Sequence, residues 1–266
     1  MEKKYKLTEE TINVNGRTLH RIEALKDFND VKKGDKGGFI ENEKNLSQSD
    51  TCWVYGNARV YNNAVVYDNA TISGKAVVSD RAVVFGNAKV FGNAQILVDA
   101  IVCEDAQIYG DTMVFGDAKV YGNAKVFENA QVFGKAEVYH NAQVYGNAKV
   151  FENAEVSFDA KVYDDAKVYE YAMVQGNAKV YGNAEVCTNA CIYGDAVIDS
   201  IRDYIVFKNF WSSGRSFTWT RSNDMWKVGC FYGTGKELIE KAYKDSEISG
   251  REYERIVKYV ETIKGK

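Results

Sequence analysis

Histidine is scarce in this chain, which limits the acid–base chemistry that it could perform. The 266 residues include two histidines, His20 and His140. A general base needs an orienting partner and a substrate pocket within hydrogen-bond reach. Glu137 and Glu155 lie near His140 in the expected fold, at a spacing that is ordinary for a protein surface. We therefore expect His140 to be an exposed surface residue and keep it as a weak catalytic candidate; His20 is no stronger.

The sequence also offers few ligands for a metal ion or a phosphate group. A zinc site built from three histidines is excluded by their number, and Cys187 and Cys191 precede and follow a corner, so that they project from different faces. The run GTGKE at 233–237 is reminiscent of a phosphate-binding loop, but Cys230 stands where that loop requires Gly and Glu237 where it requires Ser or Thr. We predict no metal and no cofactor.

Aromatic and basic side chains are concentrated in the last 66 residues, which contain three of the four tryptophans. Trp and Arg are enriched in interface hot spots, and basic aromatic surfaces can stack nucleic-acid bases. The candidate partner-binding residues are Trp211, Arg215, Phe217, Trp219, Arg221 and Trp226. The alternative is that these rings form the core of a small domain, which is favoured because 66 residues need a core. Both interpretations stay open at this point.

A six-residue repeat contains His140 and precedes the tail, so the structure that it forms must position these candidates. From Val54 in steps of six to Ile198, all 25 positions are Val or Ile. The fourth residue after each is Ala in 23 of 24 hexads, Thr112 being the exception, and the third is Asn or Asp in 20 of 24. Ala and the next aliphatic residue are two apart, so both point inward from an extended strand. Each hexad is therefore predicted to be one short strand and one tight turn.

Stacked coils explain this pattern and the missing prolines. A single short strand cannot bury its apolar face, whereas coils stacked on one another form a continuous core. Gly and Asn suit the corners because both tolerate a positive φ. The chain contains no proline, and a proline would remove a ladder donor at nearly every position.

Residues 54–198 resemble the hexapeptide-repeat family, although the second position of the motif is usually Tyr or Phe here. That resemblance implies a mainly β protein, a left-handed parallel β-helix with three strands per triangular coil. The 25 hexads then give about eight coils, or roughly 40 Å at ~4.8 Å per coil. Many members of the family are acyl-CoA-dependent acyltransferases with a catalytic His near a groove between trimer subunits, often with a loop that interrupts the coils. No loop interrupts the period here.

Nearly the whole chain is similar to a group of phage and prophage proteins of unassigned role. The similarity rests on the VYGNA repeats together with the tail WKVGCFYGTGKEL. It implies no catalytic residues, and it implies a host defence or regulatory protein as the target.

The outward residue after each core aliphatic is aromatic in 17 of 25 hexads, which predicts ring ladders on adjacent strands. One region differs because its outward strand positions carry no charge on three consecutive coils. This apolar patch comprises Val65, Tyr67, Val83, Phe85, Ile101 and Cys103. A contiguous apolar patch is usually covered, so we expect it to pack against the N-terminal segment or another subunit.

Three segments follow from these patterns. Residues 1–51 are expected to form a hairpin around Asn15-Gly16 and a cap, 52–200 the β-helix, and 201–266 a βββαα module. The module begins its first helix at the capping box Thr234–Glu237 and its second at Ser249–Glu252. It has a net charge of +4, whereas the β-helix has −7.

For function, we favour a non-enzymatic scaffold that binds a macromolecular partner through the tail. The alternatives are an acyltransferase using acetyl-CoA or another acyl-CoA in a trimer groove, and a binder of a small nucleotide or glycan. A near-neutral charge argues against nucleic acid held by bulk charge alone. Five cysteines without a framework spacing, no apolar leader and no apolar run of ~20 residues favour a cytoplasmic protein without a membrane span.

Overall fold

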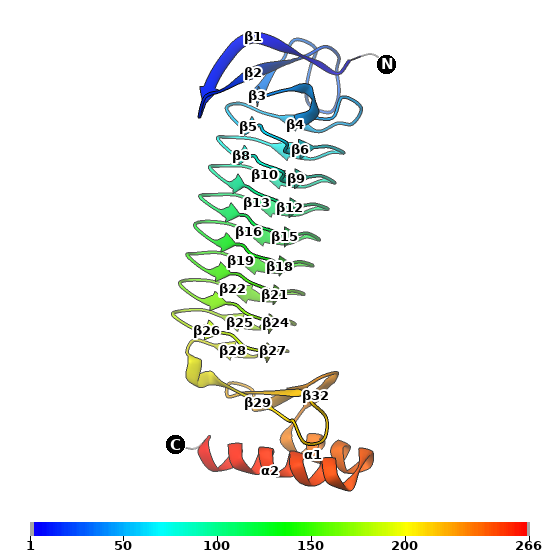
Figure 1. Cartoon of the computed structure of the whole chain (residues 1–266), viewed down its shortest axis with the longest axis vertical. Helices are drawn as coiled ribbons and strands as arrows, with labels where there is room; N and C mark the ends of the chain where they lie inside the picture. Colours follow the sequence, from blue (N-terminus) through cyan, green and yellow to red (C-terminus); the bar gives the residue numbers. More distant parts are fainter. Residues whose placement is uncertain (1–2, 265–266) are drawn as a thin grey trace.

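The computed structural model describes residues 3–264 as a three-sided rod with a different structure at each end (Figure 1). Strands β4 to β28 are two residues long and recur every six residues, from Trp53–Val54 (β4) to Val197–Ile198 (β28). Each pairs in parallel with the strand 18 residues away, so three strands make one coil. The predicted β-helix of hexad coils is confirmed.

The coils build three parallel sheets. The nine-stranded sheet contains β4 (Trp53–Val54), β7 (Thr71–Ile72), β10 (Lys89–Val90), β13 (Gln107–Ile108), β16 (Lys125–Val126), β19 (Gln143–Val144), β22 (Lys161–Val162), β25 (Lys179–Val180) and β28 (Val197–Ile198). The eight-stranded sheet contains β6 (Val65–Val66), β9 (Val83–Val84), β12 (Ile101–Val102), β15 (Lys119–Val120), β18 (Glu137–Val138), β21 (Glu155–Val156), β24 (Met173–Val174) and β27 (Cys191–Ile192).

The 11-stranded sheet continues into the N-terminal segment. Its coil strands are β5 (Arg59–Val60), β8 (Val77–Val78), β11 (Gln95–Ile96), β14 (Met113–Val114), β17 (Gln131–Val132), β20 (Lys149–Val150), β23 (Lys167–Val168) and β26 (Glu185–Val186). Before β5 come β3 (Lys36–Ile40), β2 (Arg17–Ala24) and β1 (Tyr5–Val14). The rod has about nine turns, one more than the repeat count predicts. Residues 36–52 make an irregular first turn, in which β3 pairs with β5 and Leu46 bridges to Val66.

The core follows the hexad directly. The inward Val and Ile residues and the Ala residues of the repeat are fully buried. Thr112, the one departure from Ala, is also fully buried, and its hydroxyl donates to the carbonyl of Tyr109 at 2.7 Å. A polar group therefore fits this core because a backbone acceptor lies within reach.

Every corner between successive coil strands begins with a residue of positive φ. Half of these residues are Gly; the others include Asn62, Asp80, Val98 and His140. Several carboxylates at this position accept the backbone N–H of the residue one coil further along, as Glu104 does from Gly122 at 2.8 Å. The corners are thereby tied to one another by side chains as well as by the backbone ladder.

The N-terminal segment closes one end of the rod. Strands β1 and β2 form an antiparallel hairpin whose turn residues, Asn15 and Gly16, have φ values of 50° and 81°. Tyr5 and Ile22 are fully buried in the core that continues through the coils. The buried Lys4 donates from Nζ to the carbonyls of Asp50 and Cys52, at 2.7 and 2.9 Å, and burial lowers the pKa of this amine.

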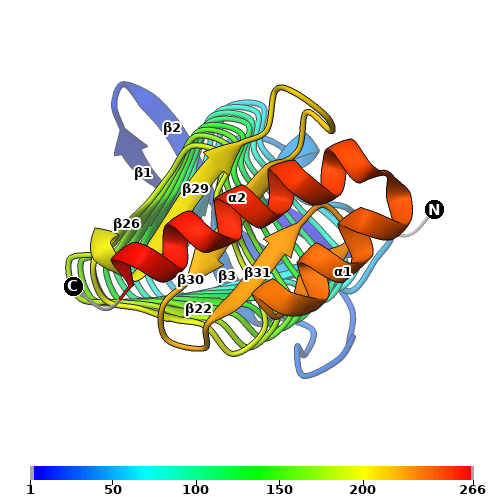
Figure 2. The same cartoon turned by 90° about the horizontal axis from the view of Figure 1, so that it is seen from below.

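The C-terminal module covers the other end (Figure 2). It contains an antiparallel sheet of β29 (Tyr204–Lys208), β30 (Ser216–Thr220), β31 (Met225–Val228) and β32 (Phe231–Gly233), followed by α1 (Gly235–Asp245) and α2 (Glu247–Ile263). The last coil donates to this module, from Cys191 N to Thr218 Oγ1 of β30 at 2.9 Å and from Val197 N to Ser222 Oγ, in the turn before β31, at 2.7 Å. The end of the β-helix is therefore not an open edge.

The module differs from the prediction in two details. The expected third strand is two strands, because Gly229 (φ 56°) turns the chain between β31 and β32. Helix α2 begins earlier than expected, since its N-cap is Ser246, whose side chain accepts from Ser249 N. The capping box of α1 is as predicted, with Thr234 Oγ1 accepting from Glu237 N at 3.3 Å. Within residues 3–264, no helix has the length and apolarity needed to span a membrane.

Candidate functional site

Three of the six tail candidates are core residues of the module. Phe217, Trp219 and Trp226 expose at most 2% of their surface and lie in the cluster between the sheet and the two helices. Phe217 packs edge-on against Tyr253, with ring centroids 4.6 Å apart, and Trp219 Nε1 donates to Asp224 Oδ1 at 2.8 Å. These three rings are corrected from partner-binding candidates to structural residues, since buried rings present no surface to another molecule.

The other three tail candidates are exposed, and Phe210, which was not among the predicted residues, is exposed with them. Trp211 is 86% exposed and Phe210 79%, while Arg215 and Arg221 are also on the surface. Strand β29 ends at Lys208, so that Phe210 and Trp211 belong to the loop before β30 rather than to a strand. We call residues 209–215 the aromatic loop.

The aromatic loop is held by one buried side chain. Asn209 is 3% exposed, and its Oδ1 accepts from the backbone N–H groups of Trp211 and Ser212 at 2.9 and 3.1 Å. Its Nδ2 donates to Ser212 Oγ at 2.9 Å. Such an Asx turn fixes the backbone locally, so the two exposed rings are displayed on an organised turn.

A hollow lies beside this loop, at the junction of module and rod. Its volume is about 520 Å³. The module contributes Ile201, Tyr204, Val206, Lys208, Phe210 and Ser216, and the last coil contributes Cys187, Thr188 and Asn189. Ile201 is itself 60% exposed. Exposed apolar side chains, a hollow and two flanking cations, Lys208 and Arg215, therefore occur together at this end of the rod.

His140 lies alone at an exposed corner, with a φ of 58°. Its nearest ring neighbours are Tyr139 and Phe158, with centroids 4.8 and 4.7 Å away. Among the described residues, its imidazole has no hydrogen-bond partner, and Glu137 and Glu155 instead accept from the hydroxyls of Tyr121 and Tyr139. No group in the described chain orients this imidazole as a general base.

The aromatic ladders predicted from the repeat are present. On the nine-stranded sheet, ring centroids follow one another at 4.7 to 5.1 Å with nearly parallel planes, through Phe91, Tyr109, Phe127, Tyr145, Tyr163 and Tyr181. The 11-stranded sheet has a second ladder of Phe115, Phe133, Phe151 and Tyr169. Because each interior ring has a neighbour on both faces, a base or sugar has only ring edges to contact.

The apolar patch lies on the eight-stranded sheet, across β6, β9 and β12. All six of its side chains are half-buried, and Tyr67 stacks on Phe85 at 4.9 Å. The N-terminal segment meets this sheet at its edge, through the bridge from Leu46 to Val66. Coverage by a second copy of the chain thus stays a prediction for this patch.

A polar cleft, which the sequence pattern does not predict, lies where the tip of the β1–β2 hairpin overhangs the coil strands of the 11-stranded sheet. It consists of adjoining hollows of about 430 and 640 Å³ that share Arg17, Asn62 and Asp80. The first is also lined by Glu41, Asn42, Asn63, Arg81 and Val98, and the second by Val14, Asn15, Arg59, Tyr61, Lys75, Val77, Ser79, Asn93, Gln95 and Leu97.

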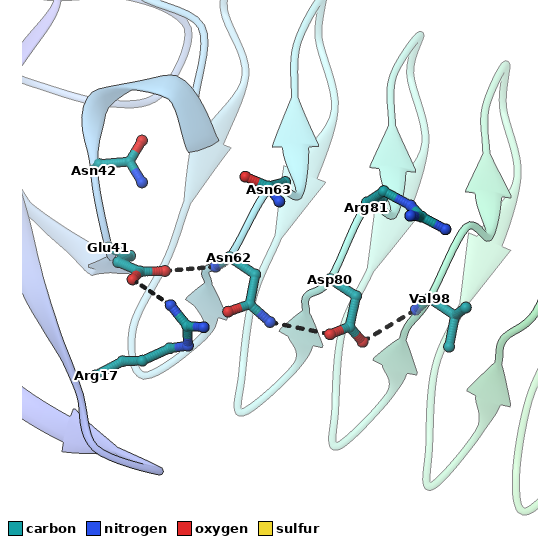
Figure 3. Close-up of a pocket in the computed structure, with 8 residues that line it drawn as sticks. All are labelled: Arg17, Glu41, Asn42, Asn62, Asn63, Asp80, Arg81 and Val98. Atoms are coloured by element: carbon teal, nitrogen blue, oxygen red, sulfur yellow. Dashed lines mark hydrogen bonds and ion pairs between the residues drawn. The ribbon is translucent and has the colours of Figure 1, made fainter.

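Hydrogen bonds link one wall of this cleft from the hairpin to the third corner (Figure 3). Glu41 accepts from Arg17 Nη1 at 2.8 Å and from Asn62 N at 2.6 Å. Asp80 accepts from Asn62 Nδ2 at 3.0 Å and from Val98 N at 3.2 Å. Asn62, Asp80 and Val98 are 18 residues apart, so the repeat itself brings these corners together.

The floor of the cleft is hollow because the aromatic ladder is interrupted there. The outward residues after the core positions are Tyr61, Ser79 and Leu97 on the first three coils of this sheet, whereas Phe115 begins the continuous ladder. Ser79 is only 3% exposed. A small side chain in a column of rings leaves space that the hairpin tip then overhangs.

The repeats and the fold define the class: this is a β-solenoid protein of the hexapeptide-repeat-like β-helix kind. The family model "YdcK Beta solenoid repeat" matches residues 54–68 and 66–80. A similar protein is "Uncharacterized acetyltransferase YdcK" of Escherichia coli (strain K12), 49% identical over 37 residues. Those residues are 14% of this chain and 11% of the relative, so the chain matches only a small part of the relative's length.

Proposed function

We propose that this protein is a non-enzymatic β-helix scaffold that binds a protein partner through the aromatic loop. The observation that carries the proposal is the pair Phe210 and Trp211, which expose most of their surface on a turn fixed by Asn209. Large exposed rings on an ordered turn can be buried by a partner at little conformational cost.

The surroundings of the loop suggest the character of the partner. Lys208 and Arg215 flank the rings, and the hollow beside Phe210 could receive an apolar side chain. The sequence gives the module a net charge of +4. We therefore propose a partner surface with an apolar projection surrounded by carboxylates. The phage resemblance adds the proposal that it is a host defence or regulatory protein.

A capture experiment from host lysate tests this function. The full chain should retain one protein in stoichiometric amount, and the double variant Phe210→Ser/Trp211→Ser should lose it. The matched control is Phe158→Ser, which removes an aromatic ring that is 45% exposed at a corner of the rod. Equal capture by the double variant and the unaltered chain would refute the loop as the binding surface.

Acetyl transfer is the second candidate function. Its support is the name of the relative, "Uncharacterized acetyltransferase YdcK", which is 49% identical to this chain over 37 residues. The candidate base would be His140 in a groove between subunits. Titration with acetyl-CoA tests it directly, since an enzyme of this kind should bind the thioester and lose turnover in His140→Ala. Absence of binding at millimolar acetyl-CoA would remove this candidate.

A further inference from the structure

We propose that the cleft beneath the β1–β2 hairpin binds an anionic sugar, a monosaccharide with a phosphate or carboxylate group. This site is at the opposite end of the rod from the aromatic loop, and the proposal does not depend on the proposed function. It rests on two unpaired cations, one unpaired buried acceptor and a partly apolar floor.

The cations create an excess of positive charge in the cleft. Arg59 is half-buried in its floor and Lys75 is exposed at its rim, and neither forms an ion pair with any of residues 3–264. The two carboxylates of the lining, Glu41 and Asp80, are already engaged by Arg17, by the side chain of Asn62 and by backbone N–H groups. The guanidinium of Arg59 therefore has donors free of any carboxylate of residues 3–264, and an anion bound beside it would gain a charge-assisted hydrogen bond.

The acceptor is the side-chain oxygen of Asn62. Its Nδ2 donates to Asp80, and because a carboxylate can only accept, the orientation of the amide is fixed. The oxygen therefore points away from Asp80 (Figure 3), is buried, and receives no hydrogen bond from the described protein. A buried acceptor without a donor is costly, so a turn of the Asn62 side chain toward the cleft, where a sugar hydroxyl group would donate to this oxygen, would be favoured.

Size and floor agree with a monosaccharide. The larger hollow, about 640 Å³, lies within the range of about 300–1,000 Å³ found for small-molecule sites. Val77 and Leu97 give its floor an apolar strip for the C–H face of a ring, while Asn15, Asn93 and Gln95 offer further amides. An anion alone would use the cations only; a neutral sugar would leave Arg59 unpaired.

Calorimetric titration of the full chain tests the site with four probes: glucose 6-phosphate, glucuronate, glucose and inorganic phosphate. At least one of the two anionic sugars should bind saturably with a Kd of about 1 mM or tighter, and glucose and phosphate at least about tenfold more weakly. The two anionic probes distinguish phosphate from carboxylate as the preferred anion. No saturable binding of either anionic sugar would overturn the proposal, and so would phosphate binding as tightly as the sugar phosphate.

Variants with matched controls locate the binding. Arg59→Gln should weaken the anionic sugar about tenfold or more. Asn62→Gly, which keeps the positive φ, should weaken the sugars but leave inorganic phosphate unchanged. The controls are Lys149→Gln and Glu152→Gly, at the corresponding positions five coils further along, and both should bind like the unaltered chain. Unchanged affinity in Arg59→Gln, with a normal circular dichroism spectrum, would show that the cleft is not the site.

Discussion

Asn141 donates from Nδ2 to Oδ1 of Asp159, one coil further along the rod, at 3.0 Å. Asn141 in turn accepts from Asn123 at 3.3 Å. Along the same corner, Thr51, Asn69, Asn87 and Asp105 form an earlier chain of such bonds, and Asn177 donates to Asp195 in a later one. Each chain ends at an Asp because a carboxylate has no hydrogen to pass on.

Because each amide in this ladder donates toward the next coil, substitutions of Asn141 and of Asp159 should differ in their effect on stability. Asn141→Asp would remove the donor and place two carboxylates opposite each other, so we expect a loss of about 1 kcal/mol in unfolding free energy. Asp159→Asn should change stability by less than about 0.5 kcal/mol, because the new amide can donate further along the corner. Urea unfolding at neutral pH measures both, and equal losses would contradict the ladder's direction.

Substitutions of Gly56 and Gly86 allow the cost of backbone strain to be measured apart from the cost of steric crowding. Gly86 and Gly56 have φ values of 68° and 60°, but a Cβ on Gly86 would lie 2.7 Å from Glu104 N, whereas one on Gly56 would have no atom nearer than 3.8 Å. Gly56→Ala should cost roughly 1 kcal/mol from its left-handed backbone. Gly86→Ala should cost at least about 1 kcal/mol more. Thermal or urea unfolding of both variants checks the difference.

The tyrosine ladder predicts a loss of stability at alkaline pH. Burial, and for Tyr145 the neighbouring Tyr163, raises the pKa of both phenols above the ordinary 10.0. A raised pKa in the folded state stabilises the protonated form, so this contribution is complete below pH 10.0 and is lost as the pH rises through the raised values.

Removal of the hydroxyl groups of Tyr145 and Tyr163 should therefore raise the pH at which the chain unfolds. Tyr145→Phe/Tyr163→Phe should unfold at a higher pH than the unaltered chain and show a similar melting temperature at pH 7. Circular dichroism at increasing pH follows the transition. Tyr259→Phe, on the exposed surface of α2, is the control and should leave it in place. Identical transitions in all three proteins would contradict the assignment to the ladder.

The apolar patch predicts association between copies of the chain. Val83 lies at its centre, paired with Val65 and Ile101 on the neighbouring strands. The strand positions that follow these three residues carry no charged side chain. Val83→Lys should reduce the mass measured by light scattering if a second copy covers these strands. Lys89→Glu, an exposed substitution on the nine-stranded sheet, serves as the control. An unchanged mass and solubility in Val83→Lys would exclude the patch as an interface.

Local regularity explains how much of the fold the sequence predicts. Val, Ala and the corner residues recur at fixed spacing, and each coil depends only on its neighbours, so the pattern at Val54 holds at Ile198. The module lacks such repetition. There Trp211 and Trp219 look alike in sequence, yet the Asx turn at Asn209 exposes the first and the two helices cover the second.

The cleft could not be predicted because its residues come from separate patterns. Arg17 belongs to the hairpin, Arg59 to a strand and Asp80 to a corner, and their proximity depends on how the hairpin overhangs the sheet. One signal was present in the sequence: Ser79 and Leu97 interrupt the column of rings. Such an interruption of the aromatic column indicates a hollow on the sheet, but the residues that line the hollow are determined by the tertiary fold.

The unbroken 18-residue period has a geometric consequence. Every coil adds the same rise of ~4.8 Å, and side-chain ladders along the corners resist bending. The rod thereby fixes the distance between the β1–β2 hairpin, which overhangs the cleft, and the C-terminal module, which carries the aromatic loop, at opposite ends (Figure 1). Inserting or deleting one 18-residue unit would change their separation by the rise of one coil. A function that used both ends of the rod would therefore depend on the number of repeats.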